Sequence, residues 1–344
     1  MKTNPLVFGG LLASLALAAL SPLRAEPAYH FIKAIPVARD GNWDYLSVDA
    51  AGRRLYVAHA TRVVVIDLDK DTVVGEIADT AGVHGFAVAP ELGRGFASNG
   101  KENTVSIVDL KTLKTLTKVR TGANPDAVFY EPSRKEVYAF NGRGKSATVF
   151  AAETGAVIAT IALPGKPEFA VGDPALGRVF CNIEDTSQVV AIATKTHTIA
   201  NTWALAPGEE PTGLDIDAKR HRLYVGCSNK TMVMLDAASG KVLASVPAGE
   251  GVDATAFDAG TGLAFSSAGD GTVTVARADV ADKFSVVQTL ATARGARTMT
   301  LDPSTHKLYL AAVDYEAAPV AAAGAPKARP KAVPGTFKVL VYGN

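Results

Sequence analysis

Seven positions, spaced at regular intervals along the chain, carry side chains that could do chemistry together. Six of them are ionisable, although only 20% of all residues are charged. Four carboxylates, one imidazole and one guanidinium in one place would form a polar ligand site. Crowded carboxylates would have raised pKa values unless a cation or the guanidinium compensated their charge. The seven positions are Asp44, His84, Asp126, Glu168, Thr212, Asp253 and Arg297.

A short apolar stretch with an aromatic anchor recurs seven times and defines the elements that would position these side chains. Successive anchors are 40 to 44 residues apart, which is the period of the four-stranded blades of a β-propeller. The sequence therefore predicts an all-β, seven-bladed β-propeller over residues 26–344. Each polar position then lies just ahead of an innermost strand, at the mouth of the central channel. The anchors are Tyr56, Phe96, Tyr138, Phe180, Tyr224, Phe265 and Tyr309.

Both ends of the chain are expected in one blade. The last repeat supplies only three strands, at 298–301, 307–311 and 337–342. The segment 31–36 resembles the outermost strand of another repeat, 242–247. We therefore expect the N-terminal strand to pair into the last blade, which removes an open sheet edge and closes the ring.

The polar ring has two interpretations. It is either a ligand site or a set of loop-end residues that are solvated or cap backbone groups. If it holds a hard divalent cation, Asp126 and Glu168 on neighbouring blades are the expected pair, with several waters completing the coordination. His59, which follows a second strand, either faces the mouth or is a satisfied or solvated histidine. No transition-metal site is predicted, because such a site needs at least three convergent donors.

The loops around the mouth could add further ligand contacts. Arg143 and Lys145 lie in a glycine-containing loop and could hold an anionic group, or they could serve only solubility. The segment 316–335 is rich in Ala and Pro and cannot bury a core, so we expect a mobile loop. It is either a flap over the mouth or a neutral loop expansion.

The N-terminus resembles an export signal. Lys2 precedes an apolar run from Leu6 to Leu20, and a small residue, Ala25, stands at the expected cleavage position. Residues 1–25 are thus a predicted signal peptide, with an uncleaved membrane anchor as the alternative. The mature chain is expected in the periplasm or secreted, without a membrane span.

The charge balance bears on binding of nucleic acid, and the positions of the two cysteines bear on disulfide formation. Removing residues 1–25 leaves 33 basic and 34 acidic residues, a balance that does not favour binding of nucleic acid. Cys181 and Cys227 occupy second strands of neighbouring blades and are expected on equivalent faces of their sheets. We therefore predict two free, buried thiols rather than a disulfide.

Five stretches consist mostly of core and turn residues of the repeat: Phe96-Ala97-Ser98-Asn99, Thr104-Val105-Ser106-Ile107-Val108-Asp109, Gly122-Ala123-Asn124-Pro125, Tyr138-Ala139-Phe140-Asn141 and Tyr224-Val225-Gly226-Cys227. They resemble the YVTN repeat of bacterial propellers, and the closest overall likeness is to exported YncE-like proteins. The resemblance implies seven blades and export, but no common reaction, and some members are thought to bind DNA.

The sequence favours a binding or scaffolding function over catalysis. It contains no HExxH, CxxC, CxxCH, GxSxG or Walker motif. The leading hypothesis is a periplasmic propeller that binds a small polar ligand or a protein partner at the channel mouth and rim. The alternatives are a DNA-binding YncE-like protein and an enzyme with a cation at the acidic ring, either a lactonase-like hydrolase or a quinoprotein-like oxidoreductase.

Overall fold

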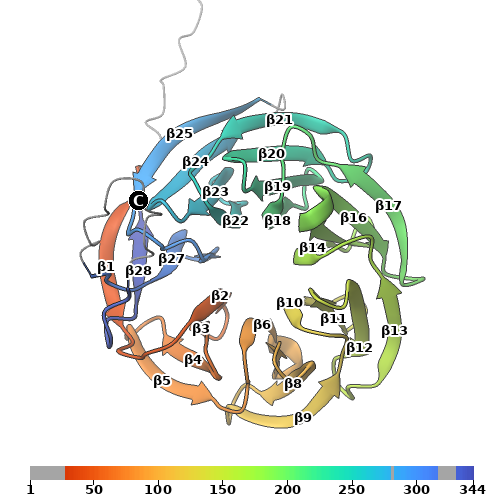
Figure 1. Ribbon diagram of the computed structural model, residues 1–344, viewed down its shortest axis with the longest axis horizontal. Coiled ribbons are helices and arrows are strands. Elements are labelled where there is room, and N and C mark those ends of the chain that lie inside the picture. The colour runs from red at the N-terminus through yellow and green to blue at the C-terminus, as the bar shows by residue number, and fades with distance from the viewer. Residues whose placement is uncertain (1–27, 280–282, 317–330) are drawn as a thin grey trace, which may run out of the picture.

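Seven four-stranded antiparallel sheets surround a central axis in the computed structural model, which describes residues 28–279, 283–316 and 331–344 (Figure 1). The predicted all-β, seven-bladed propeller is confirmed. The predicted signal peptide, 1–25, lies outside the described residues, as do residues 317–330 of the predicted loop. Within the described ranges, no helix combines the length and apolar character needed to cross a lipid bilayer.

Six blades follow the chain from the innermost to the outermost strand. Blades 1 to 3 comprise β2 Trp43–Asp49, β3 Arg54–His59, β4 Arg62–Asp67, β5 Thr72–Ile77; β6 Val83–Ala89, β7 Arg94–Asn99, β8 Thr104–Asp109, β9 Lys114–Arg120; and β10 Pro125–Glu131, β11 Glu136–Asn141, β12 Ser146–Ala151, β13 Val157–Ala162. Blades 4 to 6 comprise β14 Pro167–Asp173, β15 Arg178–Ile183, β16 Gln188–Ala193, β17 Thr198–Ala204; β18 Pro211–Asp217, β19 Arg222–Cys227, β20 Thr231–Asp236, β21 Val242–Pro247; and β22 Val252–Asp258, β23 Leu263–Ala268, β24 Thr272–Ala278, β25 Phe284–Ala291. Two short 3₁₀ helices, η1 Pro90–Leu92 and η2 Glu184–Thr186, lie in connections.

The seventh blade closes the ring as predicted. Its strands are β26 Met299–Asp302, β27 Lys307–Ala312 and β28 Lys338–Gly343, with β1 His30–Pro36 as the outermost strand. β1 pairs antiparallel to β28, with Ile35 opposite Val339. Just ahead of β1, the buried Tyr29 donates its hydroxyl hydrogen to the carbonyl oxygen of His306 at 2.8 Å. The N-terminal strand is therefore fixed to the ring by backbone pairing and by side-chain contacts.

The aromatic anchors of the repeat form the core between blades. All seven are at most 2% exposed, and several pack on the innermost strand of the next blade. The ring of Tyr56 stacks on Phe86 with centroids 4.5 Å apart, and that of Tyr224 stacks on Phe257 at 4.8 Å. Burying one such side chain contributes roughly 2–3 kcal/mol. The repeat spacing thus encodes packing between sheets.

The two cysteines are free and buried, as predicted. Cys181 belongs to an apolar cluster with Tyr138 and Ile161 of blade 3, whereas Cys227 packs in another cluster with Val171 of blade 4. Each thiol thus faces the preceding blade. Burial raises the pKa of both thiols, that of Cys227 to about 12.

Polar links also join neighbouring blades on the face opposite the mouth. The last residue of β26, Asp302, accepts a hydrogen bond at 2.8 Å from Arg53, which precedes β3 of blade 1. Asp173 pairs in the same way with His221 at 2.6 Å, and Asp258 with His306 at 2.8 Å. The φ angles of Arg53, His221 and His306 are 52°, 54° and 58°. The same left-handed turn therefore directs each of these side chains toward the preceding blade. We call these three contacts the inter-blade clamps.

Candidate functional site at the channel mouth

Six of the seven predicted mouth residues occupy the second position of an innermost strand, not the position ahead of it. In each of these blades the register between the first and second strands shifts at this residue, as at Asp44 between Trp43 and Leu46. A β-bulge of this kind turns one side chain away from the sheet. The six residues are Asp44, His84, Asp126, Glu168, Thr212 and Asp253, while Arg297 lies ahead of β26.

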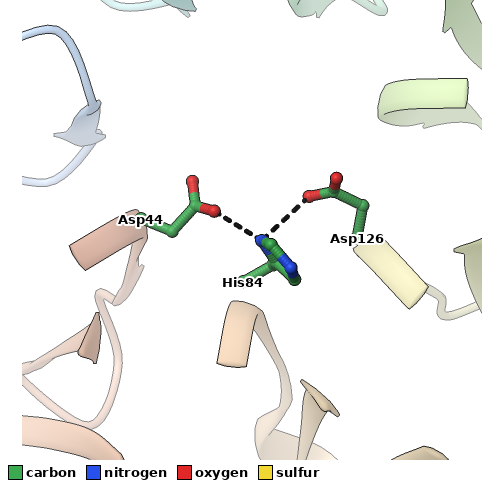
Figure 2. A group of neighbouring side chains, drawn as sticks. All are labelled: Asp44, His84 and Asp126. Carbon is green, nitrogen blue, oxygen red and sulfur yellow. Dashed lines mark hydrogen bonds and ion pairs between the residues drawn. The ribbon is translucent and has the colours of Figure 1, made fainter. Parts of the chain in front are cut away.

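Three of these side chains converge from consecutive blades (Figure 2). His84 Nδ1 lies 2.6 Å from Asp44 Oδ2 and 3.5 Å from Asp126 Oδ1. One ligand atom from each residue lies within 4.8 Å of the other two. One imidazole nitrogen and two carboxylate oxygens suit a divalent ion such as Zn²⁺ or Mn²⁺, whose bonds to such donors are about 2.0–2.2 Å. We call Asp44, His84 and Asp126 the mouth triad.

Asp126 of the mouth triad is buried, Asp44 and His84 are half-buried, and the three groups influence one another's pKa values. Burial lowers the pKa of His84, but the hydrogen bond to Asp44 and the charge of Asp126 raise it more, so the pKa lies above its ordinary value. Burial also raises the pKa of Asp126, to which the charge of Asp44 adds while His84 opposes it. The Asp126 residue is only 8% exposed, and its carboxylate accepts no hydrogen bond among the described residues. A cation between these groups would offset the cost of burying this carboxylate.

The remaining ring residues are engaged elsewhere. Glu168, the expected partner of Asp126 at a cation, instead pairs with Lys166 at 3.0 Å. Asp253 pairs with Arg297 at 3.1 Å, yet burial raises the pKa of this carboxyl to about 7. The Thr212 hydroxyl donates to the carbonyl oxygen of Val252 at 3.0 Å, a contact between blades 5 and 6. The ring therefore divides into the triad and residues that already have partners.

An aromatic pair from blades 1 and 4 meets next to the ring. Tyr45 and Phe169 follow Asp44 and Glu168 on strands of blades 1 and 4, and their rings meet edge to face with centroids 4.9 Å apart. Burial, followed by the charges of Glu168 and Asp253, raises the pKa of the Tyr45 phenol well above its ordinary value. The phenol therefore stays neutral.

A pocket of about 320 Å³ opens beside the triad. Asp44 and His84 lie in its wall together with Asn124, Lys101 and Arg143. His59 is not part of this wall: it is 1% exposed, and its ring packs on Phe337 with centroids 4.6 Å apart. His59 therefore matches neither interpretation fully: it is a buried histidine that does not line the mouth pocket and is not solvated, and its Nε2 has no hydrogen-bond partner among the described residues.

The support of the triad was not apparent from the sequence. Ser98 donates its hydroxyl to the carbonyl oxygen of Asp126 at 2.5 Å and accepts the backbone N–H of Gly85 at 2.9 Å. These bonds tie the bulge that carries His84 to the bulge that carries Asp126. Gly100 leaves room for the imidazole, since a Cβ there would lie 2.6 Å from His84 Nε2. Ser98 lies two residues after its anchor, where blades 4 and 6 also carry a polar residue, Asn182 and Ser267, that bonds to a carbonyl oxygen of the next blade. Alignment of the repeats is therefore the signal that could have located Ser98.

The fold and the mouth define a seven-bladed β-propeller with a polar site built by three consecutive blades. No protein-family model matches the chain, and no curated protein matches it. Solved structures do match. A chain of Kuenenia stuttgartiensis hydrazine synthase aligns with a TM-score of 0.69 at 15% identity, over 77% of this chain and 91% of that chain. A likeness at this identity shows the propeller fold alone.

Proposed function

We propose that this protein is an exported, YncE-like binding propeller that holds a divalent ion in the mouth triad and presents it to a small polar ligand. The convergence of the three donors Asp44, His84 and Asp126 carries this proposal. The resemblance to YVTN-repeat propellers and the signal-like N-terminus support export. The open pocket beside the triad supports ligand binding, because it leaves coordination positions of an ion accessible.

Each side chain of the mouth triad would have a defined role in binding the ion. Asp44 and Asp126 supply two negative charges that balance those of a divalent ion, and His84 supplies a nitrogen ligand through Nδ1. Tyr45 and Phe169 add an aromatic contact beside the ring.

The test is a titration of the chelator-treated full chain with Zn²⁺ and with Mn²⁺, followed by calorimetry. We expect one ion per chain for the original protein and loss of that binding in His84→Ala. His221→Ala is the matched control, because His221 makes an equally short contact of 2.6 Å with one carboxylate, Asp173, but belongs to no group of three donors among the residues that the structure describes. Equal binding by His84→Ala and the original protein would overturn the proposal.

Metal-assisted hydrolysis is the second candidate function. Three protein donors with open positions beside a pocket resemble the arrangement of catalytic zinc sites. An assay of the ion-loaded chain with lactone and ester substrates distinguishes the two functions. Turnover that is lost in Asp126→Ala would establish an enzyme, whereas ion binding without turnover supports the binding protein.

A further inference from the structure

We propose that the mouth pocket binds a doubly charged oxyanion, such as a phosphate group, through Lys101, Asn124 and Arg143. This inference rests on the proposed function, because the ion in the mouth triad is the anion's remaining partner. Lys101 follows β7, Arg143 follows β11 and Asn124 precedes β10, so two adjacent blades supply all three side chains. All three line the same pocket of about 320 Å³ as Asp44 and His84.

Lys101 and Arg143 differ from the other basic side chains around the mouth. Lys145 is paired with Asp185 at 2.7 Å, Lys230 with Glu250 at 2.9 Å, and Arg297 with Asp253 at 3.1 Å. Within the part of the chain that the structure describes, the side chains of Lys101 and Arg143 make no hydrogen bond or ion pair. Two uncompensated positive charges therefore face one pocket.

The charge of the site selects the class of ligand. The carboxylates of Asp44 and Asp126 and a divalent ion cancel one another, which leaves the charges of Lys101 and Arg143. A phosphate group carries a charge of about −1.5 to −2 at neutral pH and would neutralise them. It also has enough oxygens to contact an ion and the planar guanidinium at the same time. A singly charged carboxylate would leave one positive charge uncompensated.

Asn124 is held in place to complete the anion site. Its backbone has φ of 55°, its N–H donates to Asn103 Oδ1 at 2.8 Å, and its carbonyl oxygen accepts the N–H of Gly142 at 2.8 Å. The carboxamide lies between two glycines: a Cβ at Gly100 would be 3.1 Å from Asn124 Oδ1, and one at Gly142 would be 3.5 Å from Nδ2. This side chain makes no hydrogen bond among the described residues, so its N–H₂ can donate to a ligand oxygen.

The test is calorimetry with inorganic phosphate on the full chain, first saturated with Zn²⁺ and then freed of excess ion. We expect phosphate to bind and acetate to bind at least tenfold more weakly. The double variant Lys101→Ala, Arg143→Ala should lose at least about tenfold in phosphate affinity, since each charge-assisted hydrogen bond contributes strongly. Its Zn²⁺ affinity should stay within about twofold of the original, because neither side chain is a metal donor.

Lys145→Ala is the matched control, since the charge of this neighbouring lysine is already used by Asp185. It should bind phosphate like the original protein. Phosphate affinity that is unchanged in the double variant, or Zn²⁺ binding without any phosphate binding, would overturn the anion proposal while the metal site stands. Failure to bind Zn²⁺ is visible before phosphate is added and would overturn the proposed function together with this inference.

Discussion

At the scale of the residue, the space left by a glycine without a side chain allows His84 to contact two carboxylates at the mouth. His84 can turn Nδ1 toward two carboxylates because no side chain occupies the position of Gly100 behind it. Ser98 fixes the backbone on both sides of this contact. Such supporting groups orient a ligand side chain as effectively as the donors themselves.

Gly100→Ala should therefore weaken metal binding without removing a donor. The new Cβ would lie 2.6 Å from His84 Nε2, so the imidazole must turn away from Asp44. We expect Zn²⁺ affinity to fall by roughly 10- to 100-fold, the usual effect of disturbing a supporting group. Gly142→Ala is the matched control, because its Cβ would be 3.6 Å from Asp126 Oδ2, an ordinary contact. Equal Zn²⁺ affinities in calorimetry for the two variants would contradict this account.

At the scale of the element, the bulges in the innermost strands of blades 1 to 6 and the clamps at the far end of three innermost strands perform different tasks. Each bulge turns one side chain toward the mouth. The clamps tie the opposite end of the strand to the next blade, and they occur where the left-handed residue is Arg53, His221 or His306. Where the equivalent residue is glycine, as at Gly177 and Gly262, no side chain can reach across.

The Asp302–Arg53 clamp should make stability depend on pH in the acid range. Burial raises the pKa of Asp302, but hydrogen bonds from Ser304, Arg53 and Thr305 lower it by more than burial raises it. The resulting pKa is about 2, below the ordinary value of an aspartate. A carboxyl whose folded pKa is depressed stabilises the fold above its unfolded pKa of about 3.9, and this contribution disappears as pH falls toward the folded pKa. The expected contribution near neutral pH is about 2 kcal/mol.

Urea unfolding of the original protein and of Asp302→Asn at pH 6 and at pH 2.5 measures this effect. The variant should be less stable by about 2 kcal/mol at pH 6, and the difference should shrink at pH 2.5. A difference that is the same at both pH values would show that the ionised clamp does not contribute.

The elements were predictable from the sequence to the extent that they repeat. The aromatic anchors and the turns between strands recur in every blade, so period and strand number followed from spacing alone. Strand limits were less well predicted: the innermost strand of the last blade begins at Met299, one residue later than expected. The bulges could not be predicted, because they depend on one extra residue in a strand pair. As a result, six mouth residues lie within the innermost strands, whereas the sequence had predicted them ahead of these strands.

At the scale of the whole molecule, the ring is closed by β1, and its stability depends on burial at that closure. Ile35 of β1 is 1% exposed and packs with Val57, Val339 and Phe337, which come from blades 1 and 7. Ile32 of the same strand is 40% exposed. Two residues of one type on one strand therefore differ mainly in burial.

Ile35→Ala should destabilise the propeller by about 2–5 kcal/mol, the usual cost of a large-to-small change in a core. Ile32→Ala should cost less than about 1 kcal/mol, since it removes little buried surface. The midpoints of chemical denaturation of the two variants measure the difference. Equal midpoints would contradict a closure that depends on the buried face of β1.

The candidate site was predictable only in part, because it depends on the whole ring. The seven positions could be placed one per blade from the repeat, and Asp44, His84 and Asp126 were among them. The length of each side chain and its other partners decide which three residues converge. Glu168, for example, already forms an ion pair with Lys166. His59 was ambiguous because its environment includes Phe337, which is distant in sequence and reaches it only through ring closure.

The central claim is that three consecutive blades build one metal site at the mouth. Titration of the chelator-treated protein with Zn²⁺, for the original chain and for His84→Ala and His221→Ala, tests it most directly. The account predicts one bound ion for the original chain and for His221→Ala, and none for His84→Ala. No bound ion in the original chain, or the same binding in all three proteins, would contradict it.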